Sequence, residues 1–313
     1  MIETHTPVLL TEFLENSNFH KKKSCKIWDG TLGLGGHFAA WLKKNPSALG
    51  YGSDCDAKML EKARENLKKN NLHENIKLKQ ANYSENPFEN EGPFDIIFLD
   101  LGISSFHLDF FERGVSFRYN QTLDMRLNEN EGMPVYKWLS KASENEIKTV
   151  IQKYGEERYA AKIARKINEA KITEPVTTTF QLKKICENCY PPPKRGVMTH
   201  TQRNPSVKTF QAFRIFANKE IAHLEKSLTF LPDMLEKEGR LIMISFHSLE
   251  DRLIKHEFIS REKIFTDDPF AKSNFVYGDY KIITKKPIVP SDEEIELNSR
   301  ARSAKMRILE KIR

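Results

Sequence analysis

A glycine-rich turn that opens on an acid is the part of the sequence with the most evident chemistry. The stretch D-G-T-L-G-L-G-G-H runs from Asp29 to His37, between the apolar K-I-W and the helix-like F-A-A-W-L. Strand, glycine turn and helix commonly hold nucleotide-like cofactors, because glycine permits positive φ and a close approach of the ligand. The spacing is not the dinucleotide pattern G-x-G-x-x-G, since Phe38 stands where the third glycine counted from Gly33 would be.

The acid at the start of the turn argues against a diphosphate ligand. Two like charges about 4 Å apart repel by about 1 kcal/mol in water and about 4 kcal/mol at an effective dielectric of about 20. S-adenosylmethionine has no phosphate and carries a sulfonium and an ammonium group, which a carboxylate would attract. We therefore expect Asp29 and Gly33 to belong to the site of a cationic cofactor.

Two further acids stand at the ends of predicted strands. Asp54 closes the second strand, where an acid can accept hydrogen bonds from ribose hydroxyls of either NAD or S-adenosylmethionine. Asp100 ends the fourth strand in F-L-D-L-G-I-S-S, near the switch point where ligands of doubly wound sheets lie. Each acid could instead cap a helix, which is the role we expect for Asp56. Three acids at three strand ends, Asp29 included, favour a binding site.

The hydrophobic pattern predicts the α/β class, with a doubly wound, mostly parallel, Rossmann-like sheet. Strands and helices alternate along the first hundred residues and resume after residue 206. The predicted strands are Lys26–Thr31, Leu49–Asp54, Ile76–Ala81, Phe94–Gly102, Gly239–Phe246, Asn274–Thr284 and Arg302–Lys311. The predicted helices are Phe38–Lys44, Asp56–Asn70, Thr209 to about Glu236, and Leu249–Ser260.

The residues between the two α/β halves read as a separate, mostly helical domain. We expect residues 1–107 and 207–313 to form the cofactor domain and residues 108–206 to form the insert. The net charge of +7 is uneven, because the insert alone holds 17 basic and 12 acidic residues. An uneven basic surface indicates a polyanionic partner and a solvated surface without a partner about equally. Its basic run, which we read as facing RNA, comprises Lys183, Lys184, Lys194, Arg195, Arg203 and Lys208.

Methyl transfer from a sulfonium is an in-line displacement that depends on positioning. Methylation of pyrimidine carbon-5 needs a cysteine nucleophile at the site, but no cysteine stands directly after the fourth strand, and Cys186 and Cys189 lie in the insert. An exocyclic amino group needs only an acceptor for its proton, for which Asp100, Ser104 or a backbone carbonyl are candidates. His247 ends the fifth strand at the same edge; it could line the base pocket or cap the next helix with Ser248, and we favour a functional role.

Three other patterns have a structural explanation. Asp124 and Arg126 in L-D-M-R-L favour a structural ion pair over ligand contact. The C-E-N-C of Cys186–Cys189 has metal spacing but no second ligand pair, so no metal is expected. The apolar face of residues 210–216 is expected to pack in a hydrophobic core. Four scattered cysteines and no apolar run of about 20 residues indicate a cytoplasmic protein without a membrane span.

Taken together, many stretches resemble the RsmH (MraW) family, with matches from Thr4 to Glu310. They are H-T-P-V-L-L-T-E, D-G-T-L-G-L-G-G-H, D-L-G-I-S-S, E-R-G-V-S-F, L-D-M-R-L, Y-G-E-E-R-Y-A, K-T-F-Q-A-F-R-I, I-S-F-H-S-L-E-D-R and R-A-R-S-A-K-M-R-I-L-E. The resemblance implies a class I fold and S-adenosylmethionine-dependent methylation of a cytidine N4 in the decoding region of 16S ribosomal RNA.

The resemblance also implies roles for individual residues. By position, the cofactor contacts in the first turn would be Gly35, Gly36 and His37. Asp54 would take the ribose, and Tyr83 would lie beside the adenine.

Asp100 and His107 would complete the cofactor site, and here the chain departs from the family. The family commonly has proline–glutamine where this chain has Phe106–His107, so an imidazole replaces an amide. Asn204 and Lys208 replace a histidine and an arginine, and lysine lacks the bidentate fork of arginine.

Two other functions remain open at this point. A catalytically silent RNA-binding assembly factor could have kept the fold. A dehydrogenase is disfavoured by the glycine spacing. The sequence does not identify the oligomeric state.

Overall fold

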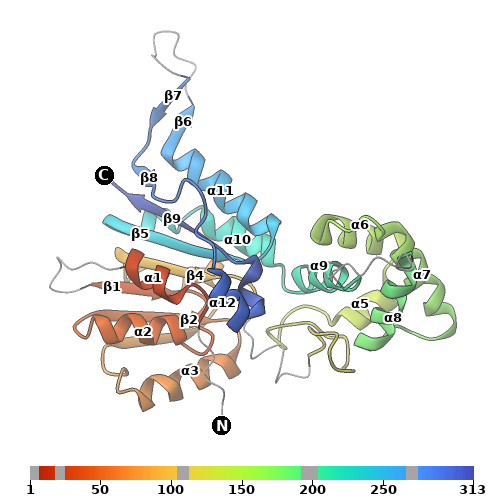
Figure 1. Ribbon diagram of the computed structural model, residues 1–313. Helices are drawn as coiled ribbons and strands as arrows, with labels where there is room; N and C mark the ends of the chain where they lie inside the picture. The colour runs from red at the N-terminus through yellow and green to blue at the C-terminus, as the bar shows by residue number, and fades with distance from the viewer. Residues whose placement is uncertain (1–6, 18–24, 104–112, 192–203, 266–273) are drawn as a thin grey trace. The chain divides into compact units, whose positions relative to one another are not determined.

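The computed structural model describes residues 7–17, 25–103, 113–191, 204–265 and 274–313. The chain divides into two compact units (Figure 1). The first comprises residues 1–102 and 221–313, and the second comprises residues 103–220. Within the described ranges, no helix is both long enough and apolar enough to cross a membrane.

The first unit is built on a seven-stranded sheet with the order β3-β2-β1-β4-β5-β9-β8. Strands β1 to β5 are parallel, β9 runs antiparallel to β5, and β8 runs antiparallel to β9. The predicted doubly wound, mostly parallel sheet is therefore confirmed. The strands are β1 (Lys26–Asp29), β2 (Leu49–Asp54), β3 (Ile76–Gln80), β4 (Phe94–Asp100), β5 (Leu235–Ser245), β8 (Tyr280–Ile282) and β9 (Lys305–Lys311).

Helices cover both faces of this sheet, because successive strand residues point to opposite faces. Ile96 and Phe98 of β4 pack in one core, with α1, α2 and α3, and Ile97 and Leu99 pack in the other, with α10 and α11. The helices of this unit are α1 (Leu10–Asn16), α2 (Gly36–Lys44), α3 (Ala57–Lys69), α10 (Glu220–Leu228), α11 (Ser248–Glu262) and α12 (Asp292–Leu297), with 3-10 turns η1 (Tyr83–Glu85), η2 (Pro232–Met234) and η3 (Ser299–Ser303). The sheet is thus buried on both sides, as its continuous apolar strands predict.

Two predicted elements are wrong in their extent. The single helix expected from Thr209 to Glu236 is two helices, α9 (Val207–Ala217) and α10, because Lys219 between them has a left-handed φ of +50°. The strand expected over 274–284 is divided at Gly278. Its first part, β7 (Phe275–Tyr277), pairs with β6 (Lys263–Phe265) in a separate two-stranded ribbon, and its second part is β8.

The second unit is helical around its own core. Its helices are α5 (Val135–Lys141), α6 (Glu144–Gly155), α7 (Ala160–Thr173), α8 (Thr179–Cys189) and α9. Phe210 and Phe213 of α9 are buried in this core, which confirms the core assignment of that face. Because α9 packs there, this unit extends to Glu220 rather than ending near Ser206. Cys186 and Cys189 are also fully buried core residues, and burial raises the pKa of Cys186 to about 12.

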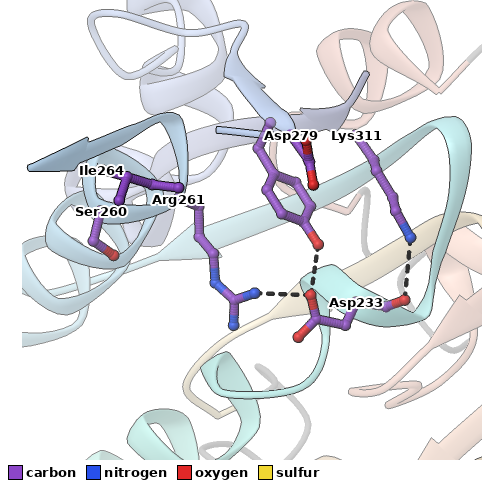
Figure 2. A pocket seen from close by; sticks show the side chains of 7 residues that line it. Asp233, Ser260, Arg261, Ile264, Asp279 and Lys311 are labelled. Carbon is purple, nitrogen blue, oxygen red and sulfur yellow. Dashed lines mark hydrogen bonds and ion pairs between the residues drawn. The ribbon is translucent and has the colours of Figure 1, made fainter. Parts of the chain in front are cut away.

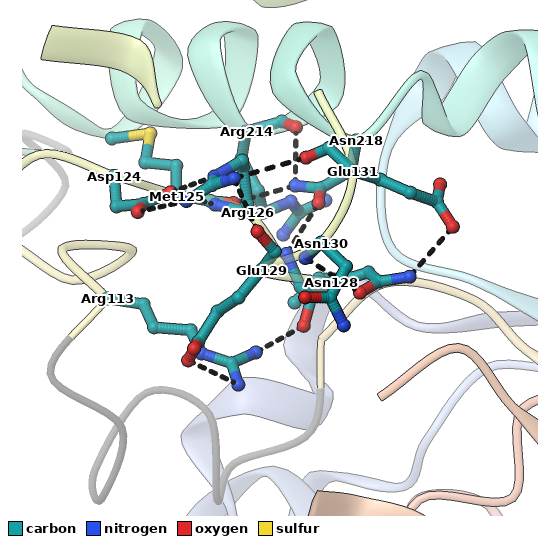
Figure 3. Close-up of polar contacts among 11 residues, drawn as sticks. Arg113, Asp124, Met125, Arg126, Asn128, Glu129, Asn130, Glu131, Arg214 and Asn218 are labelled. Atoms are coloured by element: carbon teal, nitrogen blue, oxygen red, sulfur yellow. Dashed lines mark hydrogen bonds and ion pairs between the residues drawn. The ribbon is translucent and has the colours of Figure 1, made fainter. Parts of the chain in front are cut away.

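The expected Asp124–Arg126 pair is present in a loop of the second unit (Figure 3). The Arg126 guanidinium donates to both carboxylate oxygens of Asp124, at 2.7 and 2.9 Å, and to the carbonyl of Glu129 at 2.7 Å. Between the two charged residues, Met125 has a left-handed φ of +64°. The side chain of Asn218 donates to the Met125 carbonyl at 2.8 Å. The pair therefore fixes a strained turn, and its role is structural.

Removing this pair should destabilise the fold. We expect Arg126→Ala to lower the free energy of unfolding by about 1–3 kcal/mol, since it leaves a mostly buried carboxylate without its bidentate partner. Arg165→Ala is the control, because Arg165 is 58% exposed and lies 3.7 Å from Glu169; its effect should stay within about 0.5 kcal/mol. Urea unfolding measures both. Equal effects of the two substitutions would contradict the structural role.

Candidate active site

The glycine turn lies between the ends of three parallel strands. After β1 ends at Asp29, the Gly30 N–H donates to the Phe98 carbonyl of β4 at 3.0 Å. The Leu32 N–H donates to the Ser53 carbonyl of β2 at 2.9 Å. The turn is therefore held on both sides by the neighbouring strands. Gly33 and Gly35 have left-handed φ of +54° and +76°, which glycine adopts at little cost.

Two other glycines of the turn are required by packing. A Cβ on Gly30 would lie 2.4 Å from Cδ2 of Leu99 and 3.0 Å from Cβ of Tyr83. A Cβ on Gly36 would lie 2.6 Å from Cγ of Pro7. The structure thus places Tyr83, in η1, directly against the start of the turn. Gly30 was not among the predicted site residues, although it follows the acid directly in sequence.

Strand register brings the three predicted acids together. Asp29 is paired with Gly52 of β2 and with Phe98 of β4. Asp54 and Asp100 each lie two residues beyond these partners, at the same edge of the sheet. Burial raises the pKa of Asp29, and the negative charges of Asp100 and Asp54 raise it further.

Asp54 organises the turn as well as facing the site. Its Oδ2 accepts a hydrogen bond from the Gly33 N–H at 2.8 Å, and its Oδ1 accepts one from the Asp56 N–H at 2.9 Å. Asp56 accepts from the Lys58 N–H and caps α3, which confirms its predicted role.

Asp29 is buried and electrostatically strained. Only 2% of its surface is exposed, and burial raises the pKa of its carboxyl group well above the usual range. One hydrogen bond from the Thr31 N–H, at 3.1 Å, acts in the opposite direction on the pKa, and the charges of Asp100 and Asp54 raise it further. A positive group placed among these carboxylates would relieve this cost.

Asp100 carries the clearest sign of an incomplete site. Its buried Oδ1 has no hydrogen-bond partner among the described residues, although 27% of the side chain is exposed. Burial raises the pKa of Asp100 to about 7, and the negative charge of Glu250 adds to the shift. Its backbone N–H donates to Oγ1 of Thr31 at 2.6 Å. An unpartnered acid that titrates near neutrality can hold a cation or take up a proton.

His37 links the turn to the N-terminal segment. Its Nε2 lies 2.9 Å from the Val8 carbonyl, and because a carbonyl only accepts, Nε2 carries the proton. The ring packs against Phe13 and Phe98, with centroid distances of 5.3 and 4.7 Å. Nδ1 then faces Oδ2 of Asp100 at 3.8 Å. His37 therefore lies beside the carboxylates while its other nitrogen is engaged in structure.

His247 is the N-cap residue of α11. Of the two roles considered for it, the structure therefore shows the capping role. Its Nδ1 accepts a hydrogen bond from the Glu250 N–H at 3.3 Å, and Glu250 accepts in return from the Phe246 N–H at 2.9 Å. Nε2 lies 3.1 Å from Oε1 of Glu250. Sequence reasoning missed Glu250, which is buried and raises the pKa of Asp100. The spacing H-S-L-E, similar to a capping box, was the available signal.

The remaining predicted site residues lie outside the described residues or belong to the second unit. Ser104 and His107 lie outside the described residues, as do Lys194, Arg195 and Arg203. In the second unit, Lys184 is exposed and Lys183 lies 3.9 Å from Glu187 on the same helix.

Lys208 has a structural contact in the second unit. It donates to the carbonyl of Glu156, at the end of α6, at 2.7 Å. This is a favourable place for a cation, because the end of a helix is negative.

Comparisons with known proteins identify relatives of this chain. The sequence model of the MraW methylase family matches residues 3–312. Ribosomal RNA small subunit methyltransferase H of Prochlorococcus marinus is 37% identical over 315 residues, which cover 98% of this chain and 94% of the relative. The proteins of the same name from Caldicellulosiruptor saccharolyticus and Clostridium botulinum are each 39% identical over 321 residues, covering 98% of this chain and 99% of the relative.

The raised pKa of Asp100 predicts a pH dependence of stability. Between the unfolded pKa of about 3.9 and the folded pKa of about 7, the folded protein binds a proton that the unfolded chain has lost. The contribution of Asp100 to stability is thus greatest below pH 4 and is lost as the pH rises to 7.

Asp100→Asn should remove this dependence. Relative to the wild type, it should gain stability on the order of 2–4 kcal/mol between pH 4 and pH 8, measured by urea unfolding. Asp292→Asn, at an exposed position of α12, is the control and should leave the pH profile unchanged. Parallel profiles for the wild type and Asp100→Asn would show that Asp100 has an ordinary pKa.

Proposed function

This chain belongs to the MraW methylase family, and we propose that it transfers a methyl group from S-adenosylmethionine to the N4 amino group of a cytidine in small-subunit ribosomal RNA. The buried Oδ1 of Asp100, which has no hydrogen-bond partner among the described residues and lies with the other acids at the strand ends, is the observation that carries this proposal. The decoding region of 16S RNA as target, and the cytoplasm as compartment, are part of the proposal.

The residues present fit the methyl donor, which supplies an electrophilic methyl group on a positively charged sulfur. Asp29, Asp54 and Asp100 would offer carboxylates to its positive charges and ribose hydroxyls. The turn from Gly33 to Gly36 allows the ligand to approach the backbone, and Tyr83 lies against Gly30, directly after Asp29. A cation at this site lowers the pKa of Asp29 and Asp100, so binding and deprotonation support each other.

The acceptor nitrogen must lose a proton during the transfer. The donor would supply the methyl group and leave with a neutral sulfur, and the positive charge passed to N4 would be discharged by loss of the N4 proton. Asp100, with a pKa of about 7, is poised to accept this proton near neutral pH. Ser104 and a backbone carbonyl are the alternative acceptors. His247 has both ring nitrogens directed at Glu250, so we assign it the capping of α11 and no contact with the base.

Contact with RNA is assigned to the helical second unit. Lys183 and Lys184 lie on α8, and the proposal extends to Lys194, Arg195, Arg203 and Lys208. Phosphates attract such a run regardless of sequence. Asn204 and Lys208 stand where the family has a histidine and an arginine, so a phosphate contact there would be monodentate.

A transfer assay tests the function directly. Purified protein with donor labelled in the methyl group, and with small-subunit RNA or particles that lack the modification, should place the label on N4 of one cytidine. Nucleoside mass spectrometry identifies the product. Absence of label from cytidine N4 in both RNA and particles would contradict the proposal. It would leave a catalytically silent RNA-binding factor as the alternative.

The role of Asp100 has its own outcome in this assay. We expect Asp100→Asn to lower kcat/KM by about 100-fold or more, because the amide neither neutralises a cation nor accepts a proton effectively. Asp292→Asn should retain wild-type activity. If Asp100→Asn kept the wild-type rate, Asp100 would be neither proton acceptor nor cofactor ligand.

A further inference from the structure

A second cavity of the first unit has a character different from the site of the three acids. It has a volume of about 300 Å³ and lies along the last two turns of α11. Phe258, Ile259 and Ile282 form an apolar wall. The remaining lining residues are polar or charged: Lys255, Glu262, Lys263, Thr284, Lys285 and Arg307. We call it the α11 cavity.

The charges of the α11 cavity are mostly positive and only partly used by the fold. Arg307 donates to Asp251 at 2.7 Å, and Glu262 accepts from the Ile282 N–H at 2.9 Å. Lys255 and Lys285, by contrast, have no hydrogen bond or ion pair to any residue that the structure describes. Two cations without a carboxylate partner, at the rim of a cavity, leave a positive potential that an anion can use.

Another cavity of this unit is lined by cations that already have protein partners (Figure 2). It measures about 370 Å³, and its cations point at protein acceptors. Arg261 donates to Asp233 at 2.8 Å, and the Tyr280 hydroxyl donates to the same carboxylate oxygen at 2.7 Å. Lys311 donates to the backbone carbonyls of Asp233 and Leu235, the latter at 2.9 Å. Because these cations already have protein acceptors, the α11 cavity is the stronger candidate for binding an anion.

The ribbon beside the cavity adds aromatic surface to the positive charge. Lys263 begins β6 and is paired with Tyr277 of β7. Tyr277 is 66% exposed and Phe265 of β6 is 74% exposed. The ammonium group of Lys263 lies 4.7 Å from the ring centroid of Phe275. Exposed aromatic rings beside a lysine suit single-stranded nucleic acid, whose bases stack on the rings while its phosphates contact the cation.

Helix α11 relates this cavity to the proposed active site. His247 caps the helix at the strand edge, and the cavity begins at Lys255 and ends at Glu262. At 1.5 Å per residue, the cavity lies about 12–22 Å along the helix from its cap. With about 3.4 Å per stacked nucleotide, this corresponds to about four to six nucleotides.

We propose that the α11 cavity binds backbone phosphates of the RNA substrate, about four to six nucleotides from the base that is methylated. This inference rests on the proposed function for the identity of the RNA. It assigns to the methyltransferase unit itself a share of the RNA contacts, in addition to the helical unit. Lys255 and Lys285 supply the charge, and the apolar wall contacts the sugars.

The test is a double substitution, Lys255→Gln with Lys285→Gln, in the full chain. The matched control is Lys68→Gln with Lys69→Gln, which removes two exposed lysines from α3 of the same unit. Binding of small-subunit RNA is measured directly, without turnover, over a range of salt concentrations. Calorimetry with S-adenosylmethionine reports whether the cofactor site is intact.

We expect the double variant to bind RNA about 5- to 30-fold more weakly, corresponding to about 1–2 kcal/mol for two phosphate contacts. The slope of log K against log salt should fall by about 1.4–1.8, since each phosphate contact contributes about 0.7–0.9. Affinity for S-adenosylmethionine should match the control. An RNA affinity and a salt slope equal to those of the control would overturn the inference.

The design separates this inference from the proposed function. If the wild type methylates RNA and both variants bind RNA equally, the cavity has no role in RNA binding and the proposed methyl transfer is supported. If the wild type transfers no methyl group but the double variant loses RNA affinity, the role of the cavity in RNA binding is supported and the proposed methyl transfer is contradicted. If the substitutions weaken binding to vesicles containing phosphatidylserine but leave RNA binding unchanged, the surface serves a membrane and the inference is wrong.

Discussion

Three carboxylates forced together at one edge of a parallel sheet are the constraint on which the rest of this structure depends. Register fixes Asp54 and Asp100 two residues beyond the partners of Asp29, so their separation follows from the strands alone. Burial removes the water that would screen them, and the pKa values of Asp29 and Asp100 rise as a result. Such an arrangement costs folding energy and is balanced only by a cation or by protons. This is the physical reason a positively charged methyl donor suits the site and a pyrophosphate does not.

The residues that hold the carboxylates in place belong to the same network. Asp54 fixes Gly33 and the start of α3, so the turn and its acid are positioned by one side chain. His247 and Glu250 cap α11 while the charge of Glu250 acts on Asp100. The same helix then carries the α11 cavity on its last turns. Helix α11 thus relates the proposed proton acceptor, which Glu250 acts on beside the helix cap, to the proposed RNA contacts on its last turns, in addition to those proposed for the helical unit.

Much of this could be predicted because the signals are local. Buried strands read as apolar runs, and an acid at the end of such a strand has one possible location in a parallel sheet, so the edge that carries Asp29, Asp54 and Asp100 followed from periodicity. Glu250 was missed because its effect on Asp100 acts through space, from a helix that follows another strand. The break at Lys219 was missed because a left-handed φ at a lysine has no sequence signature. The partner of Lys208 was missed for a similar reason, because a helix end 52 residues away in sequence supplies it.

Proton release on cofactor binding tests the central claim most directly. Titration calorimetry with S-adenosylmethionine near pH 6.5, in buffers of different ionisation enthalpy, measures the number of protons exchanged. The account predicts net proton release, because the positive sulfur lowers the pKa of Asp29 and Asp100, and a smaller release with S-adenosylhomocysteine, whose sulfur is neutral. Equal proton exchange with both ligands, or no release with either, would show that these carboxylates are not arranged for a cation.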